Sequence, residues 1–404
     1  MVNKYKIALL ISCCTRKEES DKMESEIITY LDNCATTPIS ERALEVYCET
    51  SRKCYGNPSS PHFVGKTAKL ILDESKAAIA EMIGAQPEQI VFTSGGTESN
   101  NIALQGRLLC IREKTPRPIV AVSRLEHLSV DGAVSKSAVC CAHLDYYSYE
   151  EIIALVGSPN NVRNSDIATF MLVCNETGAV LPVAKLSEVF KQLNPHCFIH
   201  TDAVQAFGKY SIDVNSLGVD SLSISAHKSH GPKGIGALFI RDRALISNIY
   251  KGGKQELGIR PGTQAAPLAA SFAAAASDAY SHIVENQKLI GKLRILCIDR
   301  IKSVYPDSIV NDAFENSVYI LSITIPSLKA PDKLIDFLSL RGVCVSRSSA
   351  CSYSAFRVLR NLGIPDELCD KTIRIGFSGT STLSDIYRFE EALRCYQGSE
   401  ERES

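Results

Sequence analysis

One lysine in this 404-residue chain stands where covalent chemistry is feasible. Lys228 follows a strand-like alternating segment, 221–225, and precedes the glycine-rich run 231–236. A lysine at the exit of a strand can lie in a half-buried pocket, where loss of solvent lowers its pKa and frees the amine to form a Schiff base. The flanking Ser225 and His227 are suited to face an anion such as a phosphate ester. Taken alone, Lys228 is ambiguous, because most lysines are solvated surface residues.

Three further polar residues each come just after an apolar, strand-like segment: His127, Asn175 and Asp202. A buried carboxylate at Asp202 is costly without a positive partner, and a protonated pyridine nitrogen would be one. The imidazole of His127 could stack on a flat ring and move a proton near neutral pH. The amide of Asn175 could donate to a phenolate oxygen or a carboxylate. Each also has a plain structural alternative: a helix cap, a satisfied structural histidine and a turn residue, respectively.

A glycine turn supplies the next feature. Ser94-Gly-Gly-Thr97 stands between an apolar segment and a predicted helix, and free amides at a helix N-terminus attract phosphate. Gly96 and Thr97 are therefore candidate phosphate ligands. The alternative is an ordinary helix N-cap by Ser94 or Thr97.

The elements that must position these residues alternate between strand-like and helix-like patterns from about residue 65 to 275. This alternation favours an α/β fold with a mainly parallel sheet. The predicted strands are 89–93, 119–122, 169–173, 197–201, 221–225 and 236–240. Apolar residues at helical spacing predict helices over 66–83 and 185–193 and from the glycine turn through Leu108.

A second, smaller α+β domain is predicted at the carboxyl end of the chain. Long helices are expected over 265–302, followed by strands at 318–325 and 342–346 and by helices near 355–362 and 382–396. We expect a large domain over 37–275. The small domain would combine 1–36 with 276–404.

Composition excludes several function classes. A net charge of −1 argues against nucleic acid as a partner, and no stretch approaches the roughly 18 apolar residues that span a bilayer. The 15 cysteines are scattered without a C-x-x-C pair, which argues against a zinc site or a disulfide scaffold. No metal is therefore expected. The apolar run 7–11 is shorter than the roughly 7–15 residues of a signal sequence, so a reducing, cytoplasmic location is expected.

The order His127, Asn175, Asp202, Lys228 resembles the pyridoxal-phosphate (PLP) enzymes of the aspartate-aminotransferase fold type, fold type I. More closely, the chain resembles the cysteine desulfurases of the class-V aminotransferase family. The resemblance covers about residues 29–396 and implies a mainly parallel seven-stranded sheet in the large domain. Further runs that carry it are Tyr30-Leu-Asp-Asn-Cys-Ala-Thr-Thr-Pro38, Tyr55-Gly-Asn-Pro-Ser-Ser60, Gly252-Gly-Lys-Gln-Glu-Leu-Gly-Ile-Arg-Pro-Gly-Thr263 and Thr372-Ile-Arg-Ile375.

The resemblance implies pyridoxal 5'-phosphate as cofactor. Lys228 would hold it covalently, Asp202 would face its ring nitrogen, and His127 would stack on the ring and act in proton transfer. Gln205 and Asn175 would hydrogen-bond near the phenolic oxygen.

The resemblance also implies a phosphate site and a homodimer. Gly96 and Thr97, with Ser225 and His227, would surround the phosphate, and Thr263 would reach in from a neighbouring subunit. Gly96 stands where many relatives carry alanine, a change that is expected to matter little.

For the reaction, the resemblance implies that Arg374, together with Asn175, binds the carboxylate of L-cysteine. Cys351, in Arg347-Ser-Ser-Ala-Cys-Ser352, would take the sulfur as a persulfide while alanine is released. The sulfur would pass to an acceptor or scaffold protein for iron–sulfur clusters or tRNA thiolation. The segment between Cys351 and the helix at Arg357 is about three residues shorter than in the subgroup with a long loop. Alternatives are a selenocysteine lyase or cysteine lyase on the same scaffold, or a non-catalytic assembly scaffold.

Overall fold

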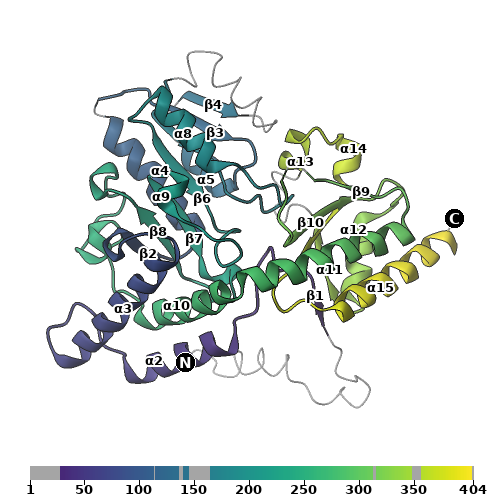
Figure 1. The fold of residues 1–404 in the computed structure, drawn as a ribbon, viewed down its shortest axis with the longest axis horizontal. Coiled ribbons are helices and arrows are strands. Elements are labelled where there is room, and N and C mark those ends of the chain that lie inside the picture. The colour runs from purple at the N-terminus through teal and green to yellow at the C-terminus, as the bar shows by residue number, and fades with distance from the viewer. Residues whose placement is uncertain are drawn as a thin grey trace, which may run out of the picture.

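The computed structural model describes residues 28–112, 114–135, 140–144, 164–312, 315–347 and 356–402. Seven strands form one sheet, and four others form a second sheet. Figure 1 shows the two sheets side by side, with the consecutive helices α10 (Ala266–Ser281) and α11 (Ile283–Val304) running from one to the other. The candidate site residues belong mainly to the larger sheet.

The larger sheet has the strand order β2-β8-β7-β6-β5-β3-β4. β8 runs antiparallel to both of its neighbours, and the pairs from β7 to β4 are all parallel, as the sequence predicted. The strands are β2 (Ile90–Thr93), β3 (Ile119–Ser123), β4 (Cys140–Leu144), β5 (Ile167–Thr169), β6 (Phe198–Asp202), β7 (Ser221–Ser225) and β8 (Gly236–Ile240).

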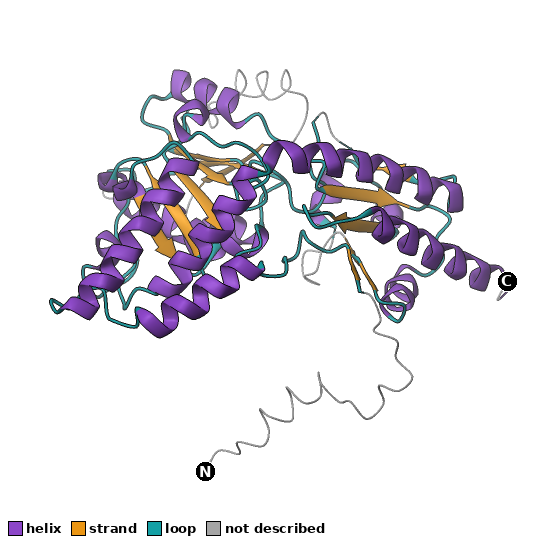
Figure 2. Cartoon of the chain, turned by 60° about the horizontal axis from the view of Figure 1, so that its bottom comes forward, coloured by secondary structure: helices purple, strands orange, loops and turns teal. Residues whose placement is uncertain are grey.

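Apolar residues are buried on both faces of this sheet, and adjacent residues of one strand belong to different clusters. Phe92 packs in the larger core and Val91 in the smaller one. Figure 2 shows helices covering the sheet. Among them, α2 (Glu41–Lys53) and α3 (Phe63–Met82) pack with α10, and α4 (Gly96–Arg112) packs with α5 (Leu128–Ser135).

Several predicted elements agree closely with the structure. The strands predicted at 221–225 and 236–240 coincide with β7 and β8, and the helix predicted at 185–193 is α8 (Val183–Leu193). The strand predicted at 169–173 is displaced, because β5 ends at Thr169 and Val173 forms a bridge with Val180 instead. β4 was not predicted, since 140–144 lacks a clear alternation of apolar and polar residues.

The smaller sheet has the order β12-β13-β10-β9, and all of its pairs are antiparallel. Its strands are β9 (Ile309–Val310), β10 (Ile320–Thr324), β12 (Ser346–Arg347) and β13 (Thr372–Gly376). Helices α12 (Pro331–Ser339) and α15 (Leu383–Arg402) pack against each other beside it. Three shorter helices are α9 (Val214–Leu217), α13 (Arg357–Asn361) and α14 (Asp366–Cys369).

The N-terminal segment lies beside this carboxyl-terminal part. β1 (Thr29–Tyr30) pairs in parallel with β11 (Val343–Cys344), and the strand predicted at 342–346 is divided between β11 and β12. The domain boundary at residue 275 stays a prediction, and in the structure this residue lies inside α10. Among the described helices, none is both long and apolar enough to cross a membrane.

Candidate active site

The carboxyl ends of the parallel strands border a cavity of about 210 Å³. Asp202 ends β6, Ser225 ends β7, and His127 follows β3 after a short turn. Parallel strands present these ends at the same edge of a sheet, where ligands commonly bind in α/β folds. The cavity is lined by Gly96, Thr97, His127, Ser129, Met171, Asn175, Asp202, Val204, Gln205, Ser225, His227 and Lys228. Most of the predicted cofactor-binding residues are thus brought together in one place.

Lys228 lies in the short helical turn η2 (Ala226–Lys228) that follows β7. Its Nζ donates to the carbonyl of Ala35 at 2.7 Å and also to the carbonyl of Cys34. Burial, and next the positive charge of Lys209, lower the pKa of Lys228 from 10.5 to about 8. A substantial fraction of this amine is therefore neutral near physiological pH, as attack on an aldehyde requires.

Asp202 is 5% exposed and accepts only from neutral groups in the described structure. Its Oδ1 accepts from the backbone N–H of Val204 at 2.9 Å, and its Oδ2 accepts from the amide of Asn100 at 2.7 Å. Among the described residues, no lysine or arginine forms an ion pair with it. A buried carboxylate that lines a cavity and has no ion-pair partner among the described residues is suited to a positively charged ligand atom, such as a protonated ring nitrogen.

His127 is held in one tautomer by Ser129. The backbone N–H of Ser129 donates to Nδ1 at 3.1 Å, and the Ser129 hydroxyl lies 2.8 Å from the same nitrogen. Because a backbone N–H can only donate, Nδ1 is the acceptor and the ring proton of the neutral imidazole is on Nε2. His127 also lines the cavity.

Sequence reasoning missed the buried residues that hydrogen-bond to Asp202 directly or in series. Asn100 accepts at Oδ1 from Nε2 of His200 at 3.0 Å, and Nδ1 of His200 is 2.7 Å from the Ser221 hydroxyl. Burial lowers the pKa of His200 to about 3, so its imidazole is neutral. The chain Ser221–His200–Asn100 therefore orients Asp202 without adding charge. The signal for Asn100 was its place three residues after Thr97, in the first turns of a helix that begins at the cavity.

The opposite end of the cavity is suited to an anion. The hydroxyl of Ser225 is buried and has no hydrogen-bond partner, which is unusual for a buried polar atom. Thr97 lies in the first turn of α4, where backbone N–H groups are available. His227 joins them, and its Nδ1 is 3.1 Å from the Thr36 hydroxyl. Unsatisfied donors at a helix N-terminus fit the phosphate that the sequence predicted there.

Gly96 is closely packed against a residue of the cavity wall. A Cβ added at Gly96 would lie 2.6 Å from Cγ2 of Val204, which itself lines the cavity. An alanine at this position would need Val204 to shift. The expectation that glycine in place of alanine has little consequence for the site stays a prediction.

Arg374 lies in β13, is 3% exposed and does not line the 210 Å³ cavity. Its guanidinium donates to the carbonyl of Asn175 at 3.0 Å, to Oδ1 of Asp32 at 3.1 Å and to the Ser346 hydroxyl at 2.8 Å. Its Nε has no partner. The contact with Asn175 places Arg374 beside the cavity wall, and its predicted role in binding a substrate carboxylate stays a prediction.

The predicted residue Thr263 is not part of the cavity wall. Thr263 is exposed, in the loop after η4 (Gln255–Gly258), and does not line the cavity of its own chain. Cys351 lies outside the described residues. Among the described residues, no group of His, Cys, Asp and Glu side chains could hold a metal ion.

Comparison with known proteins identifies the family. The family model for class-V aminotransferases matches residues 29–389. This chain belongs to the class-V aminotransferase family. It is 31% identical over 377 residues to "Cysteine desulfurase IscS" of Methanosarcina thermophila, which covers 90% of each chain. It is 33% identical over 382 residues to "Probable cysteine desulfurase, mitochondrial" of Dictyostelium discoideum, covering 90% of this chain and 82% of that relative.

Solved structures of class-V relatives agree with the fold. A "NIFS-LIKE PROTEIN" superposes with a TM-score of 0.84 at 28% identity, covering 92% of this chain and all (100%) of the other. "SspA in complex with cysteine" superposes with a TM-score of 0.73 at 27% identity, covering 87% and 99% of the two chains. The resemblance to class-V aminotransferases and cysteine desulfurases that the sequence predicted is confirmed.

Proposed function

We propose that this class-V enzyme is a PLP-dependent cysteine desulfurase that converts L-cysteine to L-alanine and leaves a persulfide on Cys351. The observation that carries the proposal is the single cavity that Lys228 and Asp202 both line, with the unpartnered Ser225 hydroxyl in its wall. Pyridoxal phosphate requires an amine that can react with its aldehyde, a carboxylate that can pair with its protonated ring nitrogen, and donors that can bind its phosphate.

Each residue has a physical task in this proposal. Lys228 would hold the aldehyde carbon covalently, Asp202 would pair with the ring nitrogen, and Ser225, His227 and Thr97 would hold the phosphate. When bound, pyridoxal phosphate supplies an electron sink for the substrate carbons. Lys228, released when the amine of L-cysteine takes its place, would also be the base for the Cα proton of cysteine, because its pKa of about 8 leaves it able to accept and return a proton near neutral pH.

The sulfur step balances as follows. The Cys351 thiolate attacks the sulfur of L-cysteine, an S–S bond forms, and the substrate C–S bond breaks. The electron pair of that bond stays with the substrate carbon, which takes a proton to become the methyl group of alanine. The sum is L-cysteine plus the Cys351 thiol giving L-alanine plus the Cys351 persulfide, with no external oxidant.

We further propose that the enzyme acts as a homodimer. Thr263 is exposed on a loop that does not border its own cavity, as a residue serving a neighbouring subunit would be. The persulfide sulfur would then pass to a separate acceptor protein, for iron–sulfur clusters or tRNA thiolation.

The decisive experiment uses the purified full-length chain supplied with pyridoxal phosphate. Borohydride treatment followed by peptide mass spectrometry is expected to show a pyridoxyl adduct on Lys228. Addition of L-cysteine is expected to release alanine and to add the mass of one sulfur atom to the peptide that contains Cys351.

Two variants make this test specific. Cys351→Ala is expected to abolish persulfide formation, while Cys344→Ala, which removes a half-buried cysteine from β11, is expected to retain it. Absence of any adduct on Lys228 would refute the cofactor assignment. Full release of sulfane sulfur by Cys351→Ala would refute the role of Cys351.

A further inference from the structure

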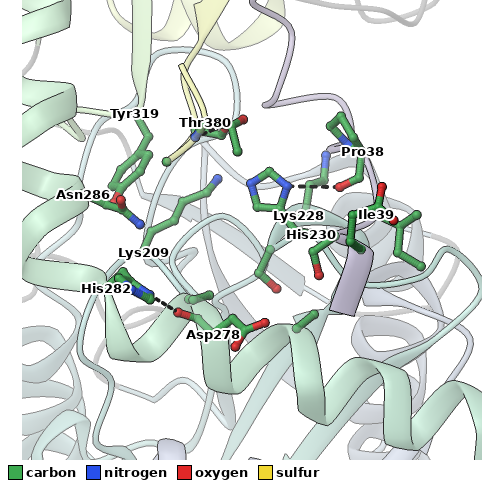
Figure 3. A pocket seen from close by; sticks show the side chains of 18 residues that line it. Pro38, Ile39, Lys209, Lys228, His230, Asp278, His282, Asn286, Tyr319 and Thr380 are labelled. Carbon is green, nitrogen blue, oxygen red and sulfur yellow. Dashed lines mark hydrogen bonds between the residues drawn. The ribbon is translucent and has the colours of Figure 1, made fainter. Parts of the chain in front are cut away.

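A second and larger cavity, of about 480 Å³, lies on the other side of Lys228. Lys228 is common to the linings of both cavities. The second cavity is enclosed by the segment 38–41 before α2, the junction of α10 and α11, and the segment 378–380 after β13 (Figure 3). We call it the rear chamber. It uses none of the other residues that line the candidate active site.

The rear chamber contains a buried amine without a counter-ion. Lys209 is 5% exposed, and its Nζ donates to Oε1 of Gln205 at 3.2 Å. The same Nζ lies 5.7 Å from the centre of the Tyr319 ring. In the described part of the chain no carboxylate forms an ion pair with Lys209. Figure 3 shows its side chain extending into the chamber, toward the side where Thr380 and His230 lie.

Such an arrangement is energetically unfavourable as it stands. Burial lowers the pKa of Lys209, because an ammonium removed from water loses its solvation. The amine has three donor positions, and one neutral acceptor satisfies only one of them. An anion beside Lys209 would compensate both its charge and its remaining donors.

The other titratable groups of the chamber do not supply that anion. Asp278 is already paired with Arg42 at 2.6 Å, and Glu41 is exposed at the start of α2. His230 donates from Nδ1 to the carbonyl of Pro38 at 3.0 Å, and burial lowers its pKa. His282 lies beside Asp278, and its Nδ1 is 2.9 Å from the Asp278 carbonyl. Among the described residues of the lining, Lys209 therefore has no carboxylate partner.

The chamber wall has further features that suit a small organic anion. The amide of Asn286 and the hydroxyl-bearing ring of Tyr319 stand near each other in Figure 3, and both border the chamber. Ala275 and Ala279 give an apolar surface along α10. A lining that combines donors with methyl groups matches a carboxylate with a short alkyl portion.

We propose that the rear chamber binds a small carboxylate, which pairs with Lys209. The binding itself does not depend on the proposed desulfurase chemistry. It does have a consequence for that chemistry, because Lys209 is the largest charge influence on Lys228 after burial. A bound carboxylate would cancel part of the repulsion between the two amines and so favour the protonated form of Lys228. The chamber would then act as a site from which a metabolite adjusts the active-site lysine.

The test is a calorimetric titration of the full chain with sodium acetate at constant ionic strength. The wild type is expected to show saturable binding. Lys209→Met is expected to bind acetate at least about tenfold more weakly, because a charge-assisted hydrogen bond is lost. Ala279→Met, which fills the chamber from α10 and keeps Lys209, is expected to weaken binding as well. Lys233→Met removes an exposed lysine two residues after Gly231 and is expected to leave binding unchanged.

A second set of titrations identifies which kind of carboxylate binds. L-alanine is titrated into borohydride-treated protein, so that chemistry at Lys228 does not contribute. Competition between L-alanine and acetate would support an amino acid as the ligand, and acetate binding without competition would support a simple carboxylate. Absence of saturable acetate binding to the wild type, equal binding to Lys209→Met, or binding of sulfate in place of acetate would overturn the proposal. The acetate titrations of the wild type and of Lys209→Met do not require an adduct at Lys228, so their failure is distinguishable from failure of the proposed function.

Discussion

His127 and Asp202, which border the candidate active site from different strands, are connected through the side-chain amide of Asn100. The amide nitrogen donates to Oδ2 of Asp202 at 2.7 Å and to the Ser129 hydroxyl at 2.8 Å. That hydroxyl in turn lies 2.8 Å from Nδ1 of His127. One buried amide thus fixes both the carboxylate and the imidazole that the proposed reaction uses.

Replacement of Asn100 by alanine is expected to impair the active site without touching substrate or cofactor directly. Asp202 would lose a buried hydrogen bond, and the fixed orientation of His127 would be lost with it. We expect cysteine-dependent alanine release to fall by about ten- to a hundredfold. The released alanine is measured together with the fraction of protein that retains pyridoxal phosphate. Asn215→Ala is the control, since Asn215 donates to the Gly84 carbonyl at an exposed position. Equal activity of the two variants would contradict the prediction.

The lowered pKa of Lys228 gives a prediction for pH. The neutral amine is the form that reacts with an aldehyde, and with a pKa of about 8 roughly one tenth of it is neutral at pH 7. The rate at which cofactor-free protein takes up pyridoxal phosphate is therefore expected to rise with pH up to about 8 and then level off. The rate is followed by borohydride trapping and quantification of the Lys228 adduct. A rate that keeps rising well beyond pH 9 would show an unshifted lysine.

Lys209 should influence the same profile. Its positive charge is the second cause, after burial, of the lowered pKa of Lys228. Lys209→Met removes that repulsion, so the midpoint of the uptake profile is expected to move to higher pH. A midpoint that stays in place or moves to lower pH would show that Lys209 does not act on Lys228 through charge.

The sequence was sufficient to place the residues whose position in the fold follows from the pattern of predicted strands. Asp202 and Lys228 stand at or just after the ends of buried apolar strands, and parallel strands bring such ends together. The alternating Ser-Leu-Ser-Ile-Ser of β7 was placed with its correct bounds. Its complete burial could not be foreseen, because alternation of polar and apolar residues ordinarily indicates one solvated face.

The residues that sequence reasoning missed owe their role to contacts distant in the chain. Asn100 meets Asp202 across 102 positions, and a polar residue in a helix gives no sign of which face it occupies. From the sequence, Lys209 would be taken for a surface lysine, yet it is buried and lines the rear chamber. The predicted set also named Arg374 without Asp32, the carboxylate that pairs with it from the other end of the chain at 3.1 Å.

Glu256 provides a prediction about stability. Its buried carboxylate accepts from Nζ of Lys76 at 2.7 Å and from the backbone N–H of Phe92 at 2.8 Å, and the amide of Gln264 donates to its other oxygen. Glu256→Gln would leave the Lys76 ammonium, in a mostly buried position, without its counter-ion. We expect the free energy of unfolding to fall by about 3 kcal/mol, measured by urea denaturation.

The matched control for Glu256 is Glu49→Gln. Glu49 pairs with Lys53 at 2.5 Å on the exposed face of α2, where solvent screens the interaction. The urea midpoint of this variant is expected to equal that of the wild type. Similar midpoints for the two variants would mean that burial does not strengthen the Glu256 contacts.

The last prediction concerns Arg357, at the start of α13. Its guanidinium donates to the carbonyl of Arg124 at 2.9 Å and to the carbonyl of Glu126, and it pairs with Asp131 at 3.0 Å. Arg357 therefore links α13, the described helix that follows Cys351 in the chain, to the turn that contains His127. Arg357→Met is expected to slow sulfur transfer to Cys351 by about tenfold, because the contacts that hold α13 against the turn at His127 would be lost. The rate is measured by mass spectrometry of the Cys351 peptide after mixing with L-cysteine.

Arg360→Met separates this role from a general effect on α13. Arg360 lies in the same helix and pairs with Asp366 at 2.6 Å in an exposed position, away from the turn at Arg124. We expect it to transfer sulfur at the wild-type rate. Parallel absorbance measurements report the interaction of L-cysteine with the cofactor, which Arg357→Met should alter less than it alters the appearance of the persulfide. Equal slowing of both steps would indicate that Arg357 serves the whole site, and an unchanged rate of persulfide formation would show that these contacts are not needed.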